Sequence, residues 1–315
     1  MVQTEEMLVR IGHSPDPDDA FMWYPLANFT GPNGVVHRPQ IDTRGFGFEH
    51  VMEDIESLNQ RSERGELEVT ALSIHQFPYV ADRYVLTSCG SSMGDGYGPI
   101  VVAKAEGEAT APGRQQGGDG GAAGLKWLKG KRLAIPGIRT SAWLSMQLRL
   151  AEAGMSAKDV DWSVVAFDEI PEAVLSGRAD AGLLIHEGQL TYEQQGLKLV
   201  EDLGVWWTQT RGLPLPLGGN AIRKDLGDQV GPLCRVLLDS IEWALAHREE
   251  SVGFALQWAR GMESDLADRF VGMYVNQWTL DYGERGRAAV TRLIEEGVGA
   301  GLVPDKGPVV FAEPG

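Results

Sequence analysis

The sequence predicts an α/β protein built as two lobes with a ligand cleft. Short apolar runs such as 181–185 alternate with helical segments, which is typical of buried parallel strands in α/β folds. The chain has 315 residues, close to the size at which one core gives way to two. Two extended segments, 99–103 and 213–218, read as crossings that bracket a middle lobe. We therefore expect lobe 1 to comprise 1–99 and 217–315, and lobe 2 to comprise 100–216.

The composition excludes several classes of partner. The formal net charge is −16, which argues against nucleic acid or an anionic membrane surface as a partner. The two cysteines form neither a metal-site spacing nor a disulfide framework. Residues 1–10 are acidic and lack the apolar core of a signal peptide, and no apolar run is long enough to span a membrane. We expect a cytoplasmic protein in which local donors hold any anionic ligand.

Periodicity and turn residues set the expected elements. Strands are expected, in chain order, at 7–12, 41–48, 69–74, 100–103, 131–135, 162–167 and 181–185. Helices are expected at 20–29, 51–64, 76–82, 125–129, 140–150, 169–176, 233–246, 251–260, 265–275 and 286–296. Pro15 and Pro17 should prevent helix before Asp18, so that Asp18 or Asp19 is the natural N-cap. The Gly/Ala-rich stretch 105–124 is expected to be a flexible surface insertion.

The strand at 181–185 ends on the most informative residues. It is followed by His186, Glu187 and Gly188. Because ligands in open α/β sheets bind outside the carboxyl ends of the strands, His186 lies where a catalytic imidazole belongs. The alternative is a histidine at the edge of the core, hydrogen-bonded to a backbone carbonyl.

The segment 13–19 is expected to be a ligand loop, with Ser14 and Asp19 as contacts. It leads into a helix, and the backbone N–H groups of a helix N-terminus favour anions. Two alternatives stay open. One is a metal site built from His13, Asp16, Asp18 and Asp19, and the other is a capped turn with solvated acids.

Hydroxyl groups lie at two further strand ends. Ser73 and His75 share a face if their strand persists that far, and would then face the ligand; alternatively they cap the next helix. Thr140 and Ser141 open a helix just after a strand, a position that suits an anion or a sugar hydroxyl. Plain N-capping by these two residues is compatible with that role.

Three motifs resemble one enzyme family. Residues 14–21, Ser-Pro-Asp-Pro-Asp-Asp-Ala-Phe, resemble the Ser-Pro-Cys-Pro-Asn-Asp-Thr-Phe opening of the 1,4-dihydroxy-6-naphthoate synthases. Residues 184–187 and 190–192 are similar to that family's Ile-Ile-His-Glu and Phe-Thr-Tyr segments, and 213–218 resemble its Leu-Pro-Leu-Pro-Leu-Gly. The resemblance spans nearly the whole chain.

This resemblance implies a fold, a reaction and a site. The fold would be the type II periplasmic-binding-protein fold. The reaction would convert cyclic dehypoxanthinyl futalosine to 1,4-dihydroxy-6-naphthoate in menaquinone biosynthesis, releasing a three-carbon piece of the sugar, without a metal or organic cofactor. His186 would be the general base, and the matched motifs place the substrate contacts at Ala71, Leu72, Ser73, Thr140, Ser141, Glu187 and Tyr192. The expected partner is a small carboxylated substrate, and the expected state is a monomer or homodimer.

The chain departs from the family pattern at four positions. Ala71 stands where the family has a lysine, Asp16 and Asp18 replace Cys and Asn, and Ala20 replaces Thr. The site is therefore expected to be more acidic and less cationic than the pattern, with His75 partly replacing the lost charge. Two other functions remain: a non-catalytic solute-binding protein for a small organic anion, and a chorismate dehydratase-like paralogue.

Overall fold

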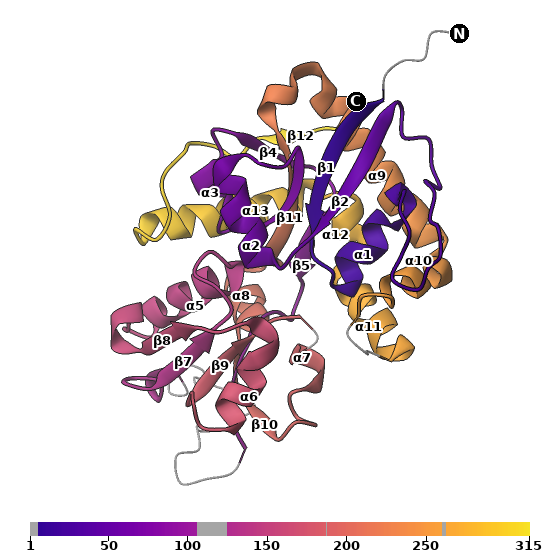
Figure 1. Cartoon of the computed structure of the whole chain (residues 1–315). Helices are drawn as coiled ribbons and strands as arrows, with labels where there is room; N and C mark the ends of the chain where they lie inside the picture. Colours follow the sequence, from indigo (N-terminus) through magenta and orange to yellow (C-terminus); the bar gives the residue numbers. More distant parts are fainter. Residues whose placement is uncertain (1–5, 106–124, 187, 260–262) are drawn as a thin grey trace, which may run out of the picture. The chain divides into compact units, whose positions relative to one another are not determined.

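The chain folds into two compact units (Figure 1). The computed structural model describes residues 6–105, 125–186, 188–259 and 263–315. Unit 1 consists of Met1–Met93, Pro216–Arg287 and Asp305–Gly315, and unit 2 of Gly94–Leu215 and Ala288–Pro304. The expected insertion at 105–124 falls, apart from residue 105, outside the described residues.

The bounds of these units differ from the expected lobes at the junction residues 94–99 and 216, and also at 288–304. The second difference has a clear physical cause, because this C-terminal segment makes its contacts with unit 2. Glu296 pairs with Arg211 at 2.7 Å, and Gly297 packs closely against Leu144. The assignment of the two units as ligand-binding lobes stays a prediction.

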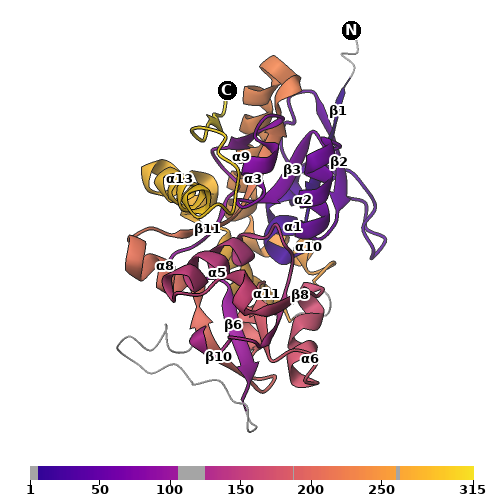
Figure 2. The ribbon, with the colours of Figure 1, turned by 90° about the vertical axis from the view of Figure 1, so that its left-hand side faces the viewer.

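Unit 1 is organised around a mixed sheet with the strand order β12-β4-β11-β3-β1-β2, and β5 pairs with β11. Figure 2 shows β1, β2 and β3 side by side. β1 is parallel to β2 and β3, whereas β11 is antiparallel to both β3 and β4. The strands are β1 (Met7–His13), β2 (Phe46–Met52), β3 (Val69–Ser73), β4 (Tyr84–Thr87), β5 (Ser92–Gly94), β11 (Leu215–Arg223) and β12 (Phe311–Ala312).

Unit 2 repeats this arrangement in a sheet with the order β10-β6-β9-β7-β8. β7 is parallel to β8 and β9, and β6 is antiparallel to β9 and β10. The strand expected at 181–185 is therefore buried as predicted, but it has one antiparallel neighbour. The strands are β6 (Ile100–Lys104), β7 (Arg132–Ile135), β8 (Asp161–Val164), β9 (Ala181–Leu184) and β10 (Leu197–Asp202).

Helices cover both sheets. They are α1 (Pro17–Trp23), α2 (Ile55–Arg64), α3 (Phe77–Val80), α5 (Ser141–Glu152), α6 (Ile170–Leu175), α7 (Gly188–Thr191), α8 (Leu203–Arg211), α9 (Val230–Ala246), α10 (Arg248–Ala255), α11 (Ser264–Tyr274), α12 (Gln277–Leu280) and α13 (Gly283–Gly299). Short 3₁₀ segments lie at Tyr24–Leu26, Ala157–Asp159, Phe167–Glu169 and Lys224–Gln229.

Some expected boundaries near the N-terminus are wrong. α1 begins at Pro17 rather than after it, because the first helical residue needs no backbone donor. Asp16, not Asp18 or Asp19, occupies the N-cap position, and it makes no side-chain cap bond. β2 begins at residue 46 and α2 at residue 55, where the Asp54 carboxylate accepts from two backbone N–H groups of the first turn.

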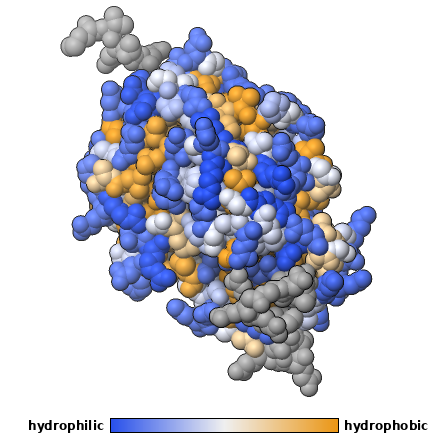
Figure 3. All heavy atoms as spheres, turned by 180° about the vertical axis from the view of Figure 1, so that it is seen from behind, coloured by the Kyte–Doolittle hydropathy of each residue, from blue (hydrophilic) through white to orange (hydrophobic). Residues whose placement is uncertain are grey.

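Each unit has its own apolar core. In unit 1, side chains of β1 such as Val9 and Ile11 pack with α1 and α9, including Phe21 and Leu237. In unit 2, the core includes Ile100, Val102, Ala134, Ile170 and Leu184. On the face drawn in Figure 3, apolar side chains lie in small groups among polar ones. Among the described residues, no helix has the length and hydropathy needed to cross a membrane.

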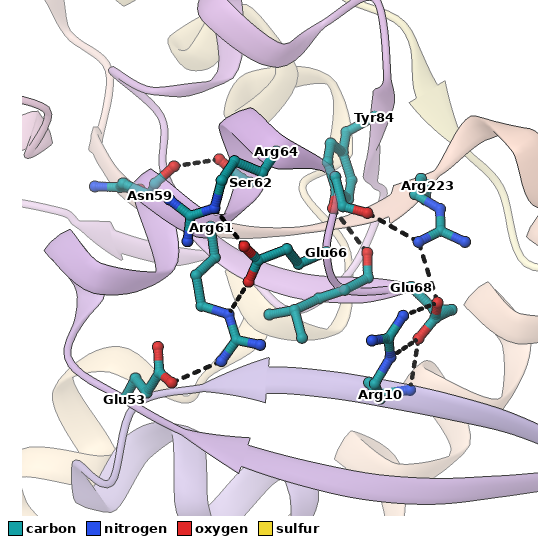
Figure 4. A network of polar contacts seen from close by, with 12 residues as sticks. Arg10, Glu53, Asn59, Arg61, Ser62, Arg64, Glu66, Glu68, Tyr84 and Arg223 are labelled. Atoms are coloured by element: carbon teal, nitrogen blue, oxygen red, sulfur yellow. Dashed lines mark hydrogen bonds and ion pairs between the residues drawn. The ribbon is translucent and has the colours of Figure 1, made fainter.

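An ion-pair cluster ties three strands of unit 1 together (Figure 4). Glu68 directly precedes β3, and its side chain is 9% exposed. Its carboxylate accepts hydrogen bonds from the backbone N, Nε and Nη2 of Arg10 on β1, at 3.0, 2.9 and 2.8 Å. Nη1 of Arg223, on β11, lies 3.1 Å from the same carboxylate. Glu68 thus fixes β3 between its two neighbours.

We expect Glu68→Gln to destabilise unit 1, because Arg10 and Arg223 would lose the charge that they share. The expected loss is about 2 kcal/mol, less than in fully buried pairs because Arg10 is 41% exposed. Urea denaturation measures it. Glu313→Gln, at an exposed pair with Arg287, is the matched control and should cost under about 1 kcal/mol. Equal losses of stability in the two variants would contradict the role of Glu68 in holding β3 to β1 and β11.

The ion pairs of Glu68 with Arg10 and Arg223 also predict that the stability of the fold depends on pH. Burial alone would raise the pKa of Glu68, but the hydrogen bonds and charges of Arg10 and Arg223 hold it below its ordinary value. A lowered pKa in the folded state stabilises the fold above the unfolded pKa of about 4.3, and this stabilisation disappears as the pH falls through the folded value. Glu68→Gln should therefore reduce the loss of stability between pH 5 and pH 3.

Candidate functional site

The predicted ligand loop follows β1 and is closed by its own side chains. Ser14 is buried, with 4% of its surface exposed. Its backbone N–H donates to Oδ2 of Asp19 at 2.8 Å, and its Oγ accepts from the backbone N–H of Asp16 at 3.2 Å. Asp19 therefore has a structural role in holding the loop against α1, whatever it does for a ligand.

The acids of this loop form no metal site in the described structure. No group of three or more His, Cys, Asp or Glu side chains among the described residues is arranged to hold a metal ion, so the metal alternative for this loop finds no support. Burial, followed by the charges of Asp19 and Asp16, raises the pKa of Asp18 well above its ordinary value. A raised pKa favours the uncharged form of this side chain relative to an ordinary aspartate.

The buried side chain of His13 pairs with that of the half-buried His50. Its Nδ1 lies 2.8 Å from the carbonyl oxygen of Ser14, and its Nε2 lies 2.9 Å from Nδ1 of His50 on β2. Because a carbonyl only accepts, Nδ1 of His13 carries the proton and its Nε2 accepts from His50. Burial lowers the pKa of His13 to about 4 and that of His50 to about 3, so both rings are neutral at neutral pH.

This pair should make the fold sensitive to acid. The folded pKa values lie below the unfolded value of about 6.5, so the unfolded chain binds more protons as the pH falls and stability is lost from pH 6.5 towards pH 4. We expect His50→Phe, which keeps the ring contact with Phe29, to flatten this part of the stability curve measured by urea denaturation. If the slope of stability against pH stayed unchanged in this variant, the acid sensitivity could not come from the histidine pair.

A groove of about 690 Å³ lies on unit 1 but contains none of the predicted contacts. Its lining includes Leu8, Phe29, Phe48, His50 and Trp258.

The second predicted cluster lies at the carboxyl end of β3. The strand ends at Ser73, so its alternation does not extend to His75. Two hydrogen bonds join Ser73 to the side chain of Asn59 on α2: the Ser73 backbone N–H donates to Oδ1 at 2.9 Å, and Nδ2 donates to Oγ at 3.1 Å. His75 is 2% exposed, and its ring lies 6.1 Å from that of Tyr79.

The neighbouring contacts predicted on β3 lie in the core of unit 1. Ala71 is 5% exposed and packs in an apolar cluster with Leu58 and Leu67. Leu72, whose side chain points to the other face of the strand, is fully buried. At the position where the family has a lysine, this chain therefore has a packing residue. Contact of either residue with a ligand stays a prediction.

In unit 2, Thr140 and Ser141 begin α5 as predicted. Thr140 is the N-cap residue, and its Oγ1 accepts from the backbone N–H of Trp143 at 3.2 Å and donates to the carbonyl oxygen of Gly137 at 2.9 Å. Ser141 is the first helical residue, and only 3% of its surface is exposed. The capping role is observed for Thr140, and the ligand role of both residues stays a prediction.

His186 has an uncommon backbone conformation. It lies two residues beyond β9 with φ of 57°, in the left-handed region that non-glycine residues seldom adopt. Its ring meets that of Phe167 edge-on at 4.6 Å, and its carbonyl oxygen accepts from Gln189 at the start of α7. Strain of this kind clusters at functional sites, where it fixes the direction of a side chain.

The other residues of the His-Glu segment are less informative. Glu187 lies outside the described residues. Tyr192 is half-buried against the core of unit 2, and its hydroxyl donates to Glu193 at 3.0 Å.

The described contacts thus form two groups, one in each unit. Ser14, Asp19, Ser73 and His75 follow β1 and β3 in unit 1, and Thr140, Ser141, His186 and Tyr192 follow β7 and β9 in unit 2. These are the carboxyl ends of parallel strands, as expected for a ligand site. Sequence reasoning missed Asn59, although an amide on the same buried helix face as Leu58 is a recognisable signal.

Comparison with known proteins shows the family to which the chain belongs. The sequence model of a family described as menaquinone biosynthesis matches residues 9–298. The chain belongs to this family. A 1,4-dihydroxy-6-naphthoate synthase from Thermus thermophilus is 36% identical over 295 residues, covering 93% of this chain and 95% of the relative. One from Streptomyces coelicolor is 34% identical over 307 residues, covering 97% and 98%.

Solved structures show the fold. A crystal structure of a protein from Archaeoglobus fulgidus is 39% identical, covers 94% of this chain and 98% of its own, and has a TM-score of 0.78. The periplasmic aliphatic sulphonate-binding protein of Escherichia coli is 13% identical, covers 98% and 92%, and has a TM-score of 0.64. The predicted family and the periplasmic-binding-protein fold are confirmed, and the relatives support the naphthoate synthase interpretation over its alternatives.

Proposed function

We propose that this protein converts cyclic dehypoxanthinyl futalosine to 1,4-dihydroxy-6-naphthoate, with His186 as the general base. The observation that carries the proposal is the near full-length similarity to two naphthoate synthases, at 36% and 34% identity. It is supported by the position of His186 two residues beyond β9, a central strand of unit 2. A solute-binding role rests only on fold likeness at 13% identity, which says nothing of function.

His186 suits proton abstraction from carbon. An imidazole nitrogen with a free lone pair can accept a proton, and a positioned base of this kind contributes about 10²–10⁴-fold in rate. In our proposal, the imidazole takes a proton from a carbon beside a developing carbonyl group as the three-carbon piece leaves. The left-handed backbone at His186 and its contact with Phe167 restrict the directions that the ring can take.

Neutral donors are proposed to hold the carboxylated substrate. The hydroxyl groups of Ser14, Ser73 and Ser141 all lie at or just beyond the carboxyl ends of strands. The pKa of Asp18 is raised, which favours its uncharged form over that of an ordinary aspartate. This arrangement compensates locally for the formal net charge of −16.

The decisive experiment compares the wild type with His186→Asn. Asparagine tolerates the left-handed conformation, so the fold should be kept. We expect kcat for naphthoate formation, followed by chromatography, to fall by about 10²–10⁴-fold, with an unchanged circular dichroism spectrum and little change in substrate binding.

Exposed His247, which stacks on Trp243, supplies the matched control. His247→Asn should leave turnover unaltered. Full activity in His186→Asn would remove His186 as the base, whereas a wild type that forms no naphthoate would refute the proposed reaction itself.

A further inference from the structure

The amide of Asn59 and the hydroxyl of Ser73 form a buried pair whose hydrogen positions can be deduced. Asn59 is fully buried and Ser73 is 3% exposed. A backbone N–H can only donate, so the Asn59 atom that meets the Ser73 N–H at 2.9 Å must be the amide oxygen. The other amide atom is therefore Nδ2, and it donates to Ser73 Oγ at 3.1 Å. The oxygen and nitrogen of this asparagine side chain are therefore not interchangeable.

The hydroxyl hydrogen is the one hydrogen-bonding group of Ser73 that these contacts leave unused. Its backbone N–H and its Oγ lone pair are used by Asn59, and its carbonyl oxygen accepts from the backbone N–H of Gln76 at 2.8 Å. Within the described part of the chain, no acceptor receives the hydroxyl hydrogen of Ser73. A buried donor without a partner costs about 1–3 kcal/mol, which a ligand oxygen would recover.

We propose that Asn59 is a positioning residue, which holds the Ser73 hydroxyl so that it donates to an oxygen of the substrate, the carboxylate above all. The inference rests on the proposed function and adds to it the direction of this hydrogen bond. β3 consists of Val69, Thr70, Ala71, Leu72 and Ser73 and has no cationic side chain. A directed neutral donor is therefore what this strand offers to an anion.

The surroundings make Asn59 rigid. Its backbone carbonyl accepts from Oγ of Ser62 at 2.5 Å and from Nε2 of Gln76 at 3.1 Å. Figure 4 shows the contact between Asn59 and Ser62 on α2. Ser62 and Gln76 are themselves fully buried. A donor whose support is locked in this way loses little entropy when the ligand binds.

Asn59→Asp and Ser73→Ala test the inference together. A carboxylate at position 59 accepts from both the N–H and the O–H of Ser73, so the hydroxyl hydrogen turns inward and the ligand loses its donor. We expect each single variant to raise KM for cyclic dehypoxanthinyl futalosine at least tenfold, as for loss of a hydrogen bond to a charged group, with kcat within about twofold. The double variant should match Ser73→Ala alone, because Asn59 acts only through Ser73.

Ser62→Ala is the control for a purely structural effect. It removes a buried hydrogen bond to the same asparagine without touching Ser73, so it should lower the free energy of unfolding and leave KM unchanged. If Asn59→Asp fails to fold, Asn59→Ser replaces it. That side chain is too short to reach Ser73 Oγ, and its rise in KM should likewise vanish in the Ser73→Ala background.

The outcomes separate the inference from the function on which it rests. A wild type without turnover refutes the proposed reaction. A wild type with turnover, combined with an unchanged KM in Ser73→Ala or with additive effects in the double variant, overturns the role of Asn59 while leaving the reaction in place.

Discussion

The carboxylate of Glu68 is the contact on which the geometry of unit 1 depends. It binds Arg10 of β1 and Arg223 of β11, the two neighbours of β3, at the amino end of that strand. Once one end of a strand is fixed, the register of the whole strand is fixed as well, because a shift of one residue would turn every side chain to the other face. The clamp therefore also determines which residues emerge at the opposite, carboxyl end, and these are the proposed ligand contacts.

The two sheets share one topology, and it places the proposed chemistry at equivalent positions. In each sheet, the first parallel strand lies between the second and the third. The third parallel strand pairs on its other side with an antiparallel strand. Ser73 ends β3, the third parallel strand of unit 1, and His186 follows β9, its counterpart in unit 2. Ser14 and Thr140 follow the corresponding first strands, β1 and β7. The proposed donor and the proposed base thus occupy the same kind of strand end.

The sequence predicted most of what depends on local pattern. Apolar runs located β1, β3 and β9, and Thr140 was correctly read as the start of α5, because strands and caps have short-range signals. The start of β2 was misplaced, and the assignment of 288–304 to unit 2 was missed, since both depend on packing between distant segments. Asn59 was missed for the same reason: its hydrogen bonds to Ser73 exist only because α2 packs against the end of β3.

The excess negative charge of this chain is compatible with an anionic substrate for a physical reason. At physiological ionic strength, charges farther than about 8 Å are largely screened, so only groups close to the ligand decide its affinity. Close to the proposed contacts, the raised pKa of Asp18 favours the uncharged form of one acid in the loop after β1. A directed hydroxyl is strong only when its acceptor lies in the right place. Recognition through such donors therefore selects the shape of the substrate and the position of its oxygens, whereas a lysine would attract any anion.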